Sequence, residues 1–217
     1  MKHPFKATVL RYTLDGTLPD SVKSPVYKDS FAIQTSVKLT VRAFSKGWKG
    51  SLPVQQMFIK RSFVPDSIEL VTPPDPKYKA AAKILSDKDL GDPNFGSGKW
   101  LGYMNNPAEI NLYFHKKIKL RSVMVNVLKR TEQYLFLPTT LEVWGGMDKS
   151  DLKLLGQIIP PLPTKNEPAT LVQQTISFAP ASIRCIKIIA KPIQSLPKWH
   201  AGKGKKGWVF LSEVVFN

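Results

Sequence analysis

The sequence predicts an all-β protein made of two successive β-sandwich domains. Its 217 residues include 18 prolines and 13 glycines, which divide the chain into short segments and disfavour long helices. In many of these segments apolar and polar residues alternate, a period of two that is typical of half-buried strands. No apolar run reaches the roughly 18 residues that a membrane-spanning helix needs, so no membrane span is expected.

The first group of predicted strands lies between residues 9 and 60. Every second residue of the stretch 37–44 is apolar, whereas Lys38, Thr40 and Arg42 lie between them. Asp15-Gly16 is a strong signal for a tight turn, and a second turn is expected before a strand at residues 55–59. This pattern predicts a small antiparallel β domain, which we assign to residues 1–62.

Short apolar segments separated by turn residues fill the chain from Ala80 to its end. We expect strands within residues 110–114, 120–127, 140–144, 152–159, 171–178, 183–190 and 208–216. Many strands at regular spacing predict a single β-sandwich over residues 80–217. The proline-rich stretch of residues 63–79 between the two groups is predicted to be a stiff linker.

The chain is strongly basic, with a net charge of +16, and the excess of lysine and arginine is spread over both halves. Such a field favours anionic partners, which include nucleic acids, acidic glycans and anionic lipids. The sequence has no recognition-helix or aromatic RNA-binding motif, so a nucleic-acid partner is not expected. The single cysteine, Cys185, lies in an apolar run and is expected to be an inert core residue.

Two spaced blocks in the first domain, residues 12–19 and 43–48, read Y-T-x-D-G-x-x-P and A-F-x-x-G-W. With residues 24–27 between them, they resemble a family of small fibronectin-like domains that are appended to bacterial chitobiases and β-hexosaminidases. The resemblance covers residues 9–60. It implies an immunoglobulin-like or fibronectin-like β-sandwich that acts as a spacer, with direct contact to a ligand as the alternative.

Four blocks of the second domain carry another resemblance. They are residues 84–92 with 99–103, residues 110–114, residues 134–144, and residues 183–188 with 196–200 and 208–214. These blocks resemble the discoidin domain, also called the coagulation-factor type C domain, a galactose-binding-like β-sandwich jelly roll that serves as a carbohydrate-binding module. The pairing of P-x-W-H with W-x-F-x-x-E is similar to modules that follow bacterial β-hexosaminidases.

An acidic loop opens the second domain. Asp87, Asp89 and Asp92 place three carboxylates within six residues, and Ca²⁺ prefers flexible cages of carboxylate and carbonyl oxygens. The resemblance implies a structural calcium ion held by carbonyls of this loop, by Asp87 and by a glutamate near the C-terminus, here Glu213. A solvated acidic turn without a metal is the alternative.

Sugar binding requires an aromatic face for the C–H surface of the ring and planar polar groups for its hydroxyls. The resemblance implies that loops at one rim of the sandwich supply both. The candidate residues are Tyr103, Asn105, Asn106, Glu132, Tyr134, Trp199 and His200. His200 has an alternative role as a hydrogen-bonded anchor of its loop. Three other tryptophans lie in or beside strand patterns and are expected in the core: Trp100, Trp144 and Trp208.

These observations predict a non-catalytic carbohydrate-binding and spacer region of a secreted glycan-degrading protein of the chitobiase or β-hexosaminidase type. Substrate-assisted hexosaminidases use an adjacent Asp-Glu pair, and the chain contains no Asp-Glu dipeptide, no G-x-S-x-G, no H-E-x-x-H and no P-loop. We expect a monomer that is extracellular, on the cell surface or periplasmic, with its catalytic domain and export signal outside this chain. Binding of anionic glycans, nucleic acid or anionic lipid through the basic surface is the alternative.

Overall fold

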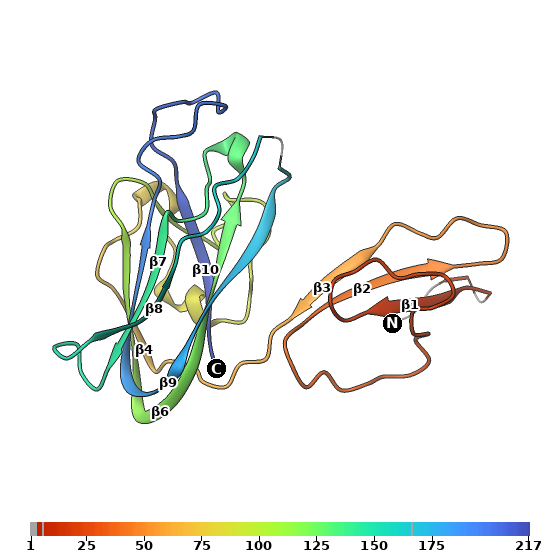
Figure 1. The fold of residues 1–217 in the computed structure, drawn as a ribbon, viewed down its shortest axis with the longest axis horizontal. Coiled ribbons are helices and arrows are strands. Elements are labelled where there is room, and N and C mark those ends of the chain that lie inside the picture. Colours follow the sequence, from red (N-terminus) through yellow and green to blue (C-terminus); the bar gives the residue numbers. More distant parts are fainter. Residues whose placement is uncertain (1–3, 6, 166) are drawn as a thin grey trace. The chain divides into compact units, whose positions relative to one another are not determined.

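The computed structural model describes residues 4–5, 7–165 and 167–217 of the chain (Figure 1). Over these residues the chain is all-β, as the sequence predicts, and its regular elements are ten strands and three short 3₁₀ turns. The chain divides into two compact units, Met1–Lys60 and Arg61–Asn217. Within the described residues, no helix is long and apolar enough to cross a membrane.

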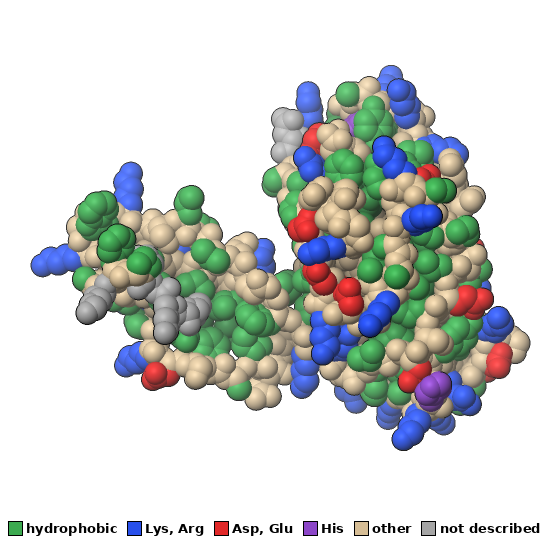
Figure 2. Space-filling model, turned by 180° about the vertical axis from the view of Figure 1, so that it is seen from behind, with side chains coloured by type: hydrophobic (Ala, Val, Ile, Leu, Met, Phe, Trp, Pro, Cys, Tyr) green, Lys and Arg blue, Asp and Glu red, His purple; other side chains and the backbone are tan. Residues whose placement is uncertain are grey.

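The first unit is built on one antiparallel sheet of three strands, β1 (Val9–Thr13), β2 (Val37–Phe44) and β3 (Val54–Phe58), in the order β1-β2-β3. Leu39 and Thr40 of β2 are buried. Many hydrophobic side chains of this unit stay on its surface (Figure 2). The large apolar side chains that are most exposed include Leu18, Val22, Trp48, Leu52 and Val54.

The predicted turn at Asp15-Gly16 is present in the structure. Gly16 has a φ of +85°, and Asp15 Oδ1 accepts the backbone N–H of Thr17 at 3.0 Å. The long loop that follows folds back on β1, where Phe31 stacks on Tyr12 with ring centroids 4.9 Å apart. The described residues of this unit therefore form one sheet layer and a covering loop, where the sequence predicted a small sandwich of two sheets.

The structure differs from the predicted linker at residues 63–79, because part of this stretch is a strand of the second unit. β4 (Ser67–Leu70) pairs antiparallel with β6 (Ala108–Lys129). Ile68 and Leu70 alternate with polar residues and pack on the main core, so this short apolar insert forms a strand despite the prolines around it. The second unit begins at Arg61.

The second unit is a two-layered antiparallel sandwich whose layers share two long strands, β6 and β9 (Thr170–Lys191) (Figure 1). One layer contains β4, residues 108–113 of β6, residues 185–191 of β9, β7 (Thr140–Gly146) and β8 (Lys153–Ile158). The other contains β5 (Leu101–Tyr103), β10 (Val209–Phe216), residues 123–129 of β6 and residues 170–177 of β9. Each long strand thus joins two segments that the sequence predicts as separate strands.

The bend of β6 changes which residues face the core. Before the bend the even-numbered residues, such as Ile110, are in the core, and after it the odd-numbered residues, such as Val125, take their place. The pairing with β9 shifts register between Leu120 and Ser122, and a shift of one residue moves the side chains of a strand to the opposite face. Core side chains of both layers consequently belong to one buried cluster.

The residues that the sequence predicts to lie in the core are buried to different extents in the structure. Trp100 is 1% exposed and packs with Phe210, and Trp208 lies at the edge of the same cluster. Trp144 is only half-buried on β7. Cys185 is buried as predicted, and burial raises the pKa of its thiol, which keeps it protonated and unreactive.

Candidate functional site

Three loops at one end of the second unit enclose an open cleft of about 610 Å³. They are the turn around η3 (Thr131–Gln133), a segment with Lys165 and residues 167–169, and residues 199–201, all at the upper end of the unit in Figure 1. Four of the predicted sugar-binding residues line this cleft: Glu132, Tyr134, Trp199 and His200. The structure thus brings together residues that lie far apart in the sequence.

Tyr134 ends the η3 turn in a left-handed backbone conformation, with a φ of 66°, and its N–H donates to the carbonyl of Thr131 at 2.9 Å. Its own carbonyl accepts the N–H of Trp208 at 2.7 Å. A Cβ atom at Gly202 would lie 2.3 Å from the Tyr134 ring, so glycine allows the C-terminal loop to approach this closely. The Tyr134 ring is therefore fixed at the edge of the cleft.

His200 is 7% exposed, and both of its ring nitrogens are hydrogen-bonded within the protein. Nδ1 accepts the N–H of Gly202 at 2.9 Å, so Nε2 carries the proton and donates to the carbonyl of Thr131 at 2.7 Å. The ring thereby ties the C-terminal loop to the η3 turn. His200 is thus the loop anchor given as the alternative, because no ring nitrogen is left for a sugar.

Trp199 is partly exposed in the cleft and rests on a buried apolar base. This base consists of Phe136, Ile193 and Leu196, and Phe136 is 0% exposed. The ring centroids of Trp199 and Phe136 are 6.1 Å apart, and Trp199 meets the ring of His200 at 5.7 Å. Because this packing restricts the indole, a ligand can stack on it with little further loss of side-chain entropy.

Two carboxylates of the cleft are neutralised by basic side chains of the protein. Arg130 binds Glu132, with Nε 2.7 Å from Oε1. Lys129 forms an ion pair with Glu167, and this contact, together with hydrogen bonds from Thr164, lowers the pKa of Glu167 to about 2. These two groups are therefore acceptors for hydroxyl groups, and neither is a protonated acid near neutral pH.

Lys165 and residues 167–169 form a wall of the cleft that was not predicted from the sequence. Lys165 and Glu167 both line the cleft from this loop. In the sequence, Thr164 and Pro168 mark this segment as a turn. In the structure the hydroxyl of Thr164 donates to Glu167 at 2.9 Å. Such a pattern predicts a compact loop but does not indicate which other loops it faces.

Two predicted sugar-binding positions lie outside the cleft. Tyr103 is 2% exposed in the main core, where burial raises the pKa of its phenol. All three residues of β5 are buried, so the structure places Tyr103 where a sugar does not reach it, contrary to the prediction. Asn105 and Asn106 are exposed, and Asn105 accepts a hydrogen bond from Lys206 at 3.1 Å, but neither residue lines the cleft.

Glu213, the predicted C-terminal calcium ligand, is held by groups of the protein itself. It is 1% exposed, the guanidinium of Arg61 forms an ion pair with its Oε1, and the N–H of Lys88 donates to its Oε2 at 3.0 Å. Arg61 also donates from Nη1 to the carbonyl of Ser86 at 2.9 Å. Burial raises the pKa of Glu213 to about 7, although Arg61 opposes the shift. The guanidinium of Arg61 thus links Glu213 to Ser86, the residue just before the acidic loop.

The three aspartates of the acidic loop also have partners within the chain. Oδ1 of Asp87, Asp89 and Asp92 each accepts a backbone N–H two residues further on, at 2.8 Å. Lys99 Nζ lies 2.9 Å from Asp89 and 3.7 Å from Asp92. Over the described part of the chain, no three His, Cys, Asp or Glu side chains are grouped to hold a metal ion. Basic groups of the protein thus already supply the positive charge that the predicted calcium ion would bring to Glu213 and to this loop.

Comparisons with known proteins give one family match and several similar solved structures. The family described as Fn3 associated matches residues 5–58, and no curated protein matches the chain. A similar solved structure is CpGH89CBM32-5 from Clostridium perfringens in complex with GalNAc-beta-1,3-galactose, with 13% identity and a TM-score of 0.47, covering 69% of this chain and 93% of that one.

Two further structures are similar in the same way. CBM32 of AlyQ, in complex with 4,5-unsaturated mannuronic acid, has 11% identity and a TM-score of 0.47, with 71% of this chain and 96% of that one covered. The family 32 carbohydrate-binding module of C. perfringens NanJ, in complex with galactose, has 14% identity and a TM-score of 0.46, with 69% and 91% covered.

Proposed function

We propose that the second unit is a non-catalytic carbohydrate-binding module whose ligand occupies the cleft beside Trp199. The proposal depends on one observation, a partly exposed indole held on a rigid apolar base and surrounded by charged and polar groups. The indole offers an apolar face to the C–H surface of a pyranose, while Glu132 and Lys165 offer an acceptor and a donor for its hydroxyls. The cleft is open and has few anchoring groups, so weak binding is expected.

The electrostatics of the cleft support binding without hydrolysis. Glycoside hydrolysis commonly needs one carboxylic acid that is protonated near neutral pH and a second carboxylate that is ionised. Lys129 lowers the pKa of Glu167 to about 2, and Glu132 is bound by Arg130. Neither group is suited to protonate a leaving sugar, so we assign the cleft a binding role.

We propose further that this region belongs to a secreted glycan-degrading protein of the chitobiase or β-hexosaminidase type. The P-x-W-H and W-x-F-x-x-E blocks support this proposal, since they contain the cleft indole Trp199, its anchor His200 and the buried Glu213. The module would hold a catalytic domain, encoded outside these residues, close to its polysaccharide. In this role the first unit is a spacer and the chain acts as an extracellular, surface-bound or periplasmic monomer.

A second candidate function is binding of an anionic ligand through the basic loop next to the cleft. Four exposed lysines of this loop favour it: Lys198, Lys203, Lys205 and Lys206. Salt separates the two candidates. Binding driven by phosphate or sulfate groups weakens steeply as salt is added, whereas stacking on a neutral sugar does not.

Replacing Trp199 with alanine is expected to weaken glycan binding by about tenfold or more, because the cleft loses its aromatic face. Binding is measured on a glycan array at two ionic strengths, with galactose-terminated and N-acetylhexosamine-terminated oligosaccharides included, and by calorimetry with the best ligand. Trp144→Ala removes a half-buried tryptophan outside the cleft and is the matched control, which should keep its binding. Full binding by a folded Trp199→Ala protein would rule out the proposed site.

A further inference from the structure

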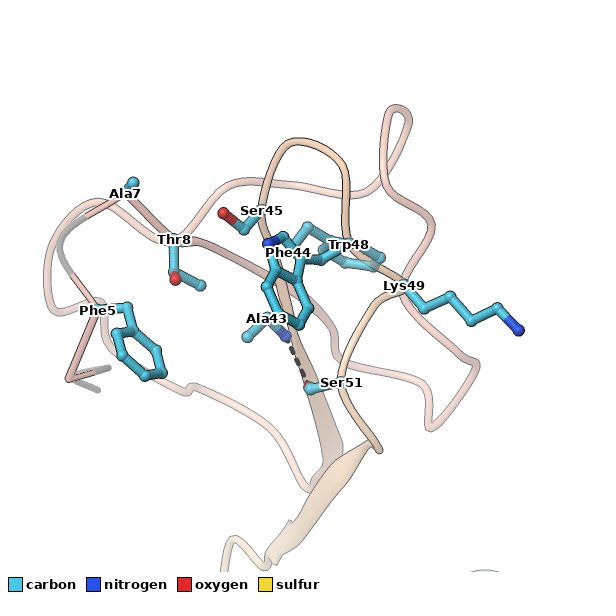
Figure 3. Close-up of a pocket in the computed structure, with 9 residues that line it drawn as sticks. All are labelled: Phe5, Ala7, Thr8, Ala43, Phe44, Ser45, Trp48, Lys49 and Ser51. Atoms are coloured by element: carbon cyan, nitrogen blue, oxygen red, sulfur yellow. Dashed lines mark hydrogen bonds between the residues drawn. The ribbon is translucent and has the colours of Figure 1, made fainter.

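The first unit presents an exposed tryptophan on the turn between β2 and β3. Trp48 is 80% exposed, and Phe44, which lies beside it in Figure 3, is half-buried. An indole in water gains none of the stabilisation that burial gives. Together with Phe44, the exposed ring of Trp48 forms an apolar surface on which a ligand can stack.

The turn that carries Trp48 is held in one conformation. The N–H of Trp48 donates to the carbonyl of Ser45 at 3.1 Å, and Gly47 supplies a φ of +79°. Ser51 closes the turn, because its N–H donates to the carbonyl of Ala43 at 2.9 Å and its hydroxyl accepts the Ala43 N–H at 3.0 Å (Figure 3). Such a pre-organised turn loses little entropy when a ligand stacks on the indole.

Trp48 and Phe44 line two neighbouring hollows. The first, about 420 Å³, is lined mainly by apolar side chains, and Phe5 lies across it from Trp48 in Figure 3. The second, about 470 Å³, is more polar and includes Asp20 and Arg42. An apolar ring face next to polar groups is the combination that recognition of a pyranose requires.

Positive charge surrounds the indole. Lys46 precedes Trp48 and Lys49 follows it, and in the described part of the chain neither lysine forms an ion pair. The guanidinium of Arg42 lies over the ring of Phe44, with Cζ 5.2 Å from the ring centroid. Residues 1–60 contain ten lysines and arginines against three aspartates and no glutamate, a net charge of +7. This field attracts a negatively charged ligand.

We propose that the Trp48 turn binds an acidic saccharide, with a uronate ring stacked on the indole and its carboxylate attracted by Arg42, Lys46 and Lys49. A uronate combines the two features that this surface complements, a C–H face and a negative charge. The hollows have the volume of a small-ligand site, roughly 300–1,000 Å³. The site lies in the first unit, to which the proposed function assigns only a spacer role, and it does not depend on the Trp199 cleft.

An NMR titration of the whole ¹⁵N-labelled chain tests this proposal. The chain has five tryptophans, and the indole N–H signal of Trp48 is the one that disappears in Trp48→Ala. Tetragalacturonate is expected to shift this signal in the wild type and equally in Trp199→Ala. Cellotetraose, a neutral chain of the same length, is expected to shift it much less. The double variant Lys46→Gln/Lys49→Gln is expected to bind tetragalacturonate about threefold or more weakly, because charge attraction is lost.

Four other outcomes overturn the proposal, each in a different way. A Trp48 signal that stays in place in millimolar tetragalacturonate rejects the site, and an equal response to cellotetraose rejects an acidic ligand. A shift that follows protein concentration without sugar would assign the turn to contacts between copies of this chain. Loss of the shift in Trp199→Ala would mean that the uronate binds the other cleft. If instead Trp199→Ala keeps the Trp48 shift and full glycan binding, only the Trp199 site is rejected.

Discussion

Replacing Arg61 with glutamine is expected to lower the free energy of unfolding by about 3–5 kcal/mol near pH 8, because it leaves a buried charge unpaired. The guanidinium of Arg61 is the charge partner of Glu213, which is 1% exposed, and it also binds the carbonyl of Ser86. Without Arg61 the carboxylate keeps the N–H of Lys88, which does not replace a positive charge. Urea unfolding followed by tryptophan fluorescence measures the loss.

The same variant is expected to change how stability depends on pH. Burial raises the pKa of Glu213 from 4.5 to about 7, with Asp87 adding to the shift and Arg61 opposing it. Since the pKa of Glu213 is raised on folding, the contribution of this carboxyl group to stability is fully present below pH 4.5 and is lost as the pH rises through about 7. Removing Arg61 raises the pKa further. The stability deficit of the variant should therefore be at most about 1.4 kcal/mol larger near pH 8 than near pH 5, since a single carboxyl titrates over this range.

Three controls isolate this charge pair. The double variant Arg61→Gln/Glu213→Gln removes both charges and is expected to recover most of the lost stability. Lys99→Gln breaks an exposed ion pair with Asp89 and should barely change the unfolding midpoint. Because Arg61 neutralises Glu213, neither calcium nor a chelator is expected to shift the wild-type midpoint. A chelator-sensitive midpoint, or an Arg61→Gln protein as stable as the wild type at about pH 8, would refute this account.

Alternation of apolar and polar residues predicts where strands lie in this chain but not how they continue. The sequence predicts separate strands at residues 110–114 and 120–127, yet β6 runs through both. Three exposed residues within it, 115–117, interrupt the apolar pattern although the strand continues. The apolar pattern reports which side chains leave water, and it does not report whether the backbone stays paired.

The residues of the cleft are predictable only in part. Tyr134 and Trp199 can be identified from the sequence because aromatic residues in loops indicate surfaces for ring stacking. The prediction for Tyr103 is wrong because the sequence around a tyrosine next to a loop looks the same whether its side chain faces the core or the rim. The sequence does not indicate the role of Arg61, because its partner Glu213 lies 152 positions away and no local pattern predicts such a contact.

Replacing Phe136 with alanine is expected to lower the free energy of unfolding by about 3–5 kcal/mol, because it leaves a cavity in a packed cluster. It is also expected to weaken glycan binding by molecules that stay folded. Phe136 is 0% exposed, and its ring centroid lies 6.1 Å from that of Trp199 and 5.5 Å from that of His200. Without this base, Trp199 gains rotamers that a ligand must restrict again on binding. Urea unfolding and calorimetry well below the unfolding midpoint measure the two effects.

Phe210→Ala separates stability from function in this prediction. Phe210 is also 0% exposed, but its ring contacts are with Tyr78, Phe95 and Trp208, which do not line the cleft. Both variants should lose similar stability, and only Phe136→Ala should lose glycan affinity. Equal loss of affinity in both would mean that binding follows global stability. If neither variant loses affinity, the apolar base does not position Trp199, and the backbone hydrogen bonds of the neighbouring His200 must do so.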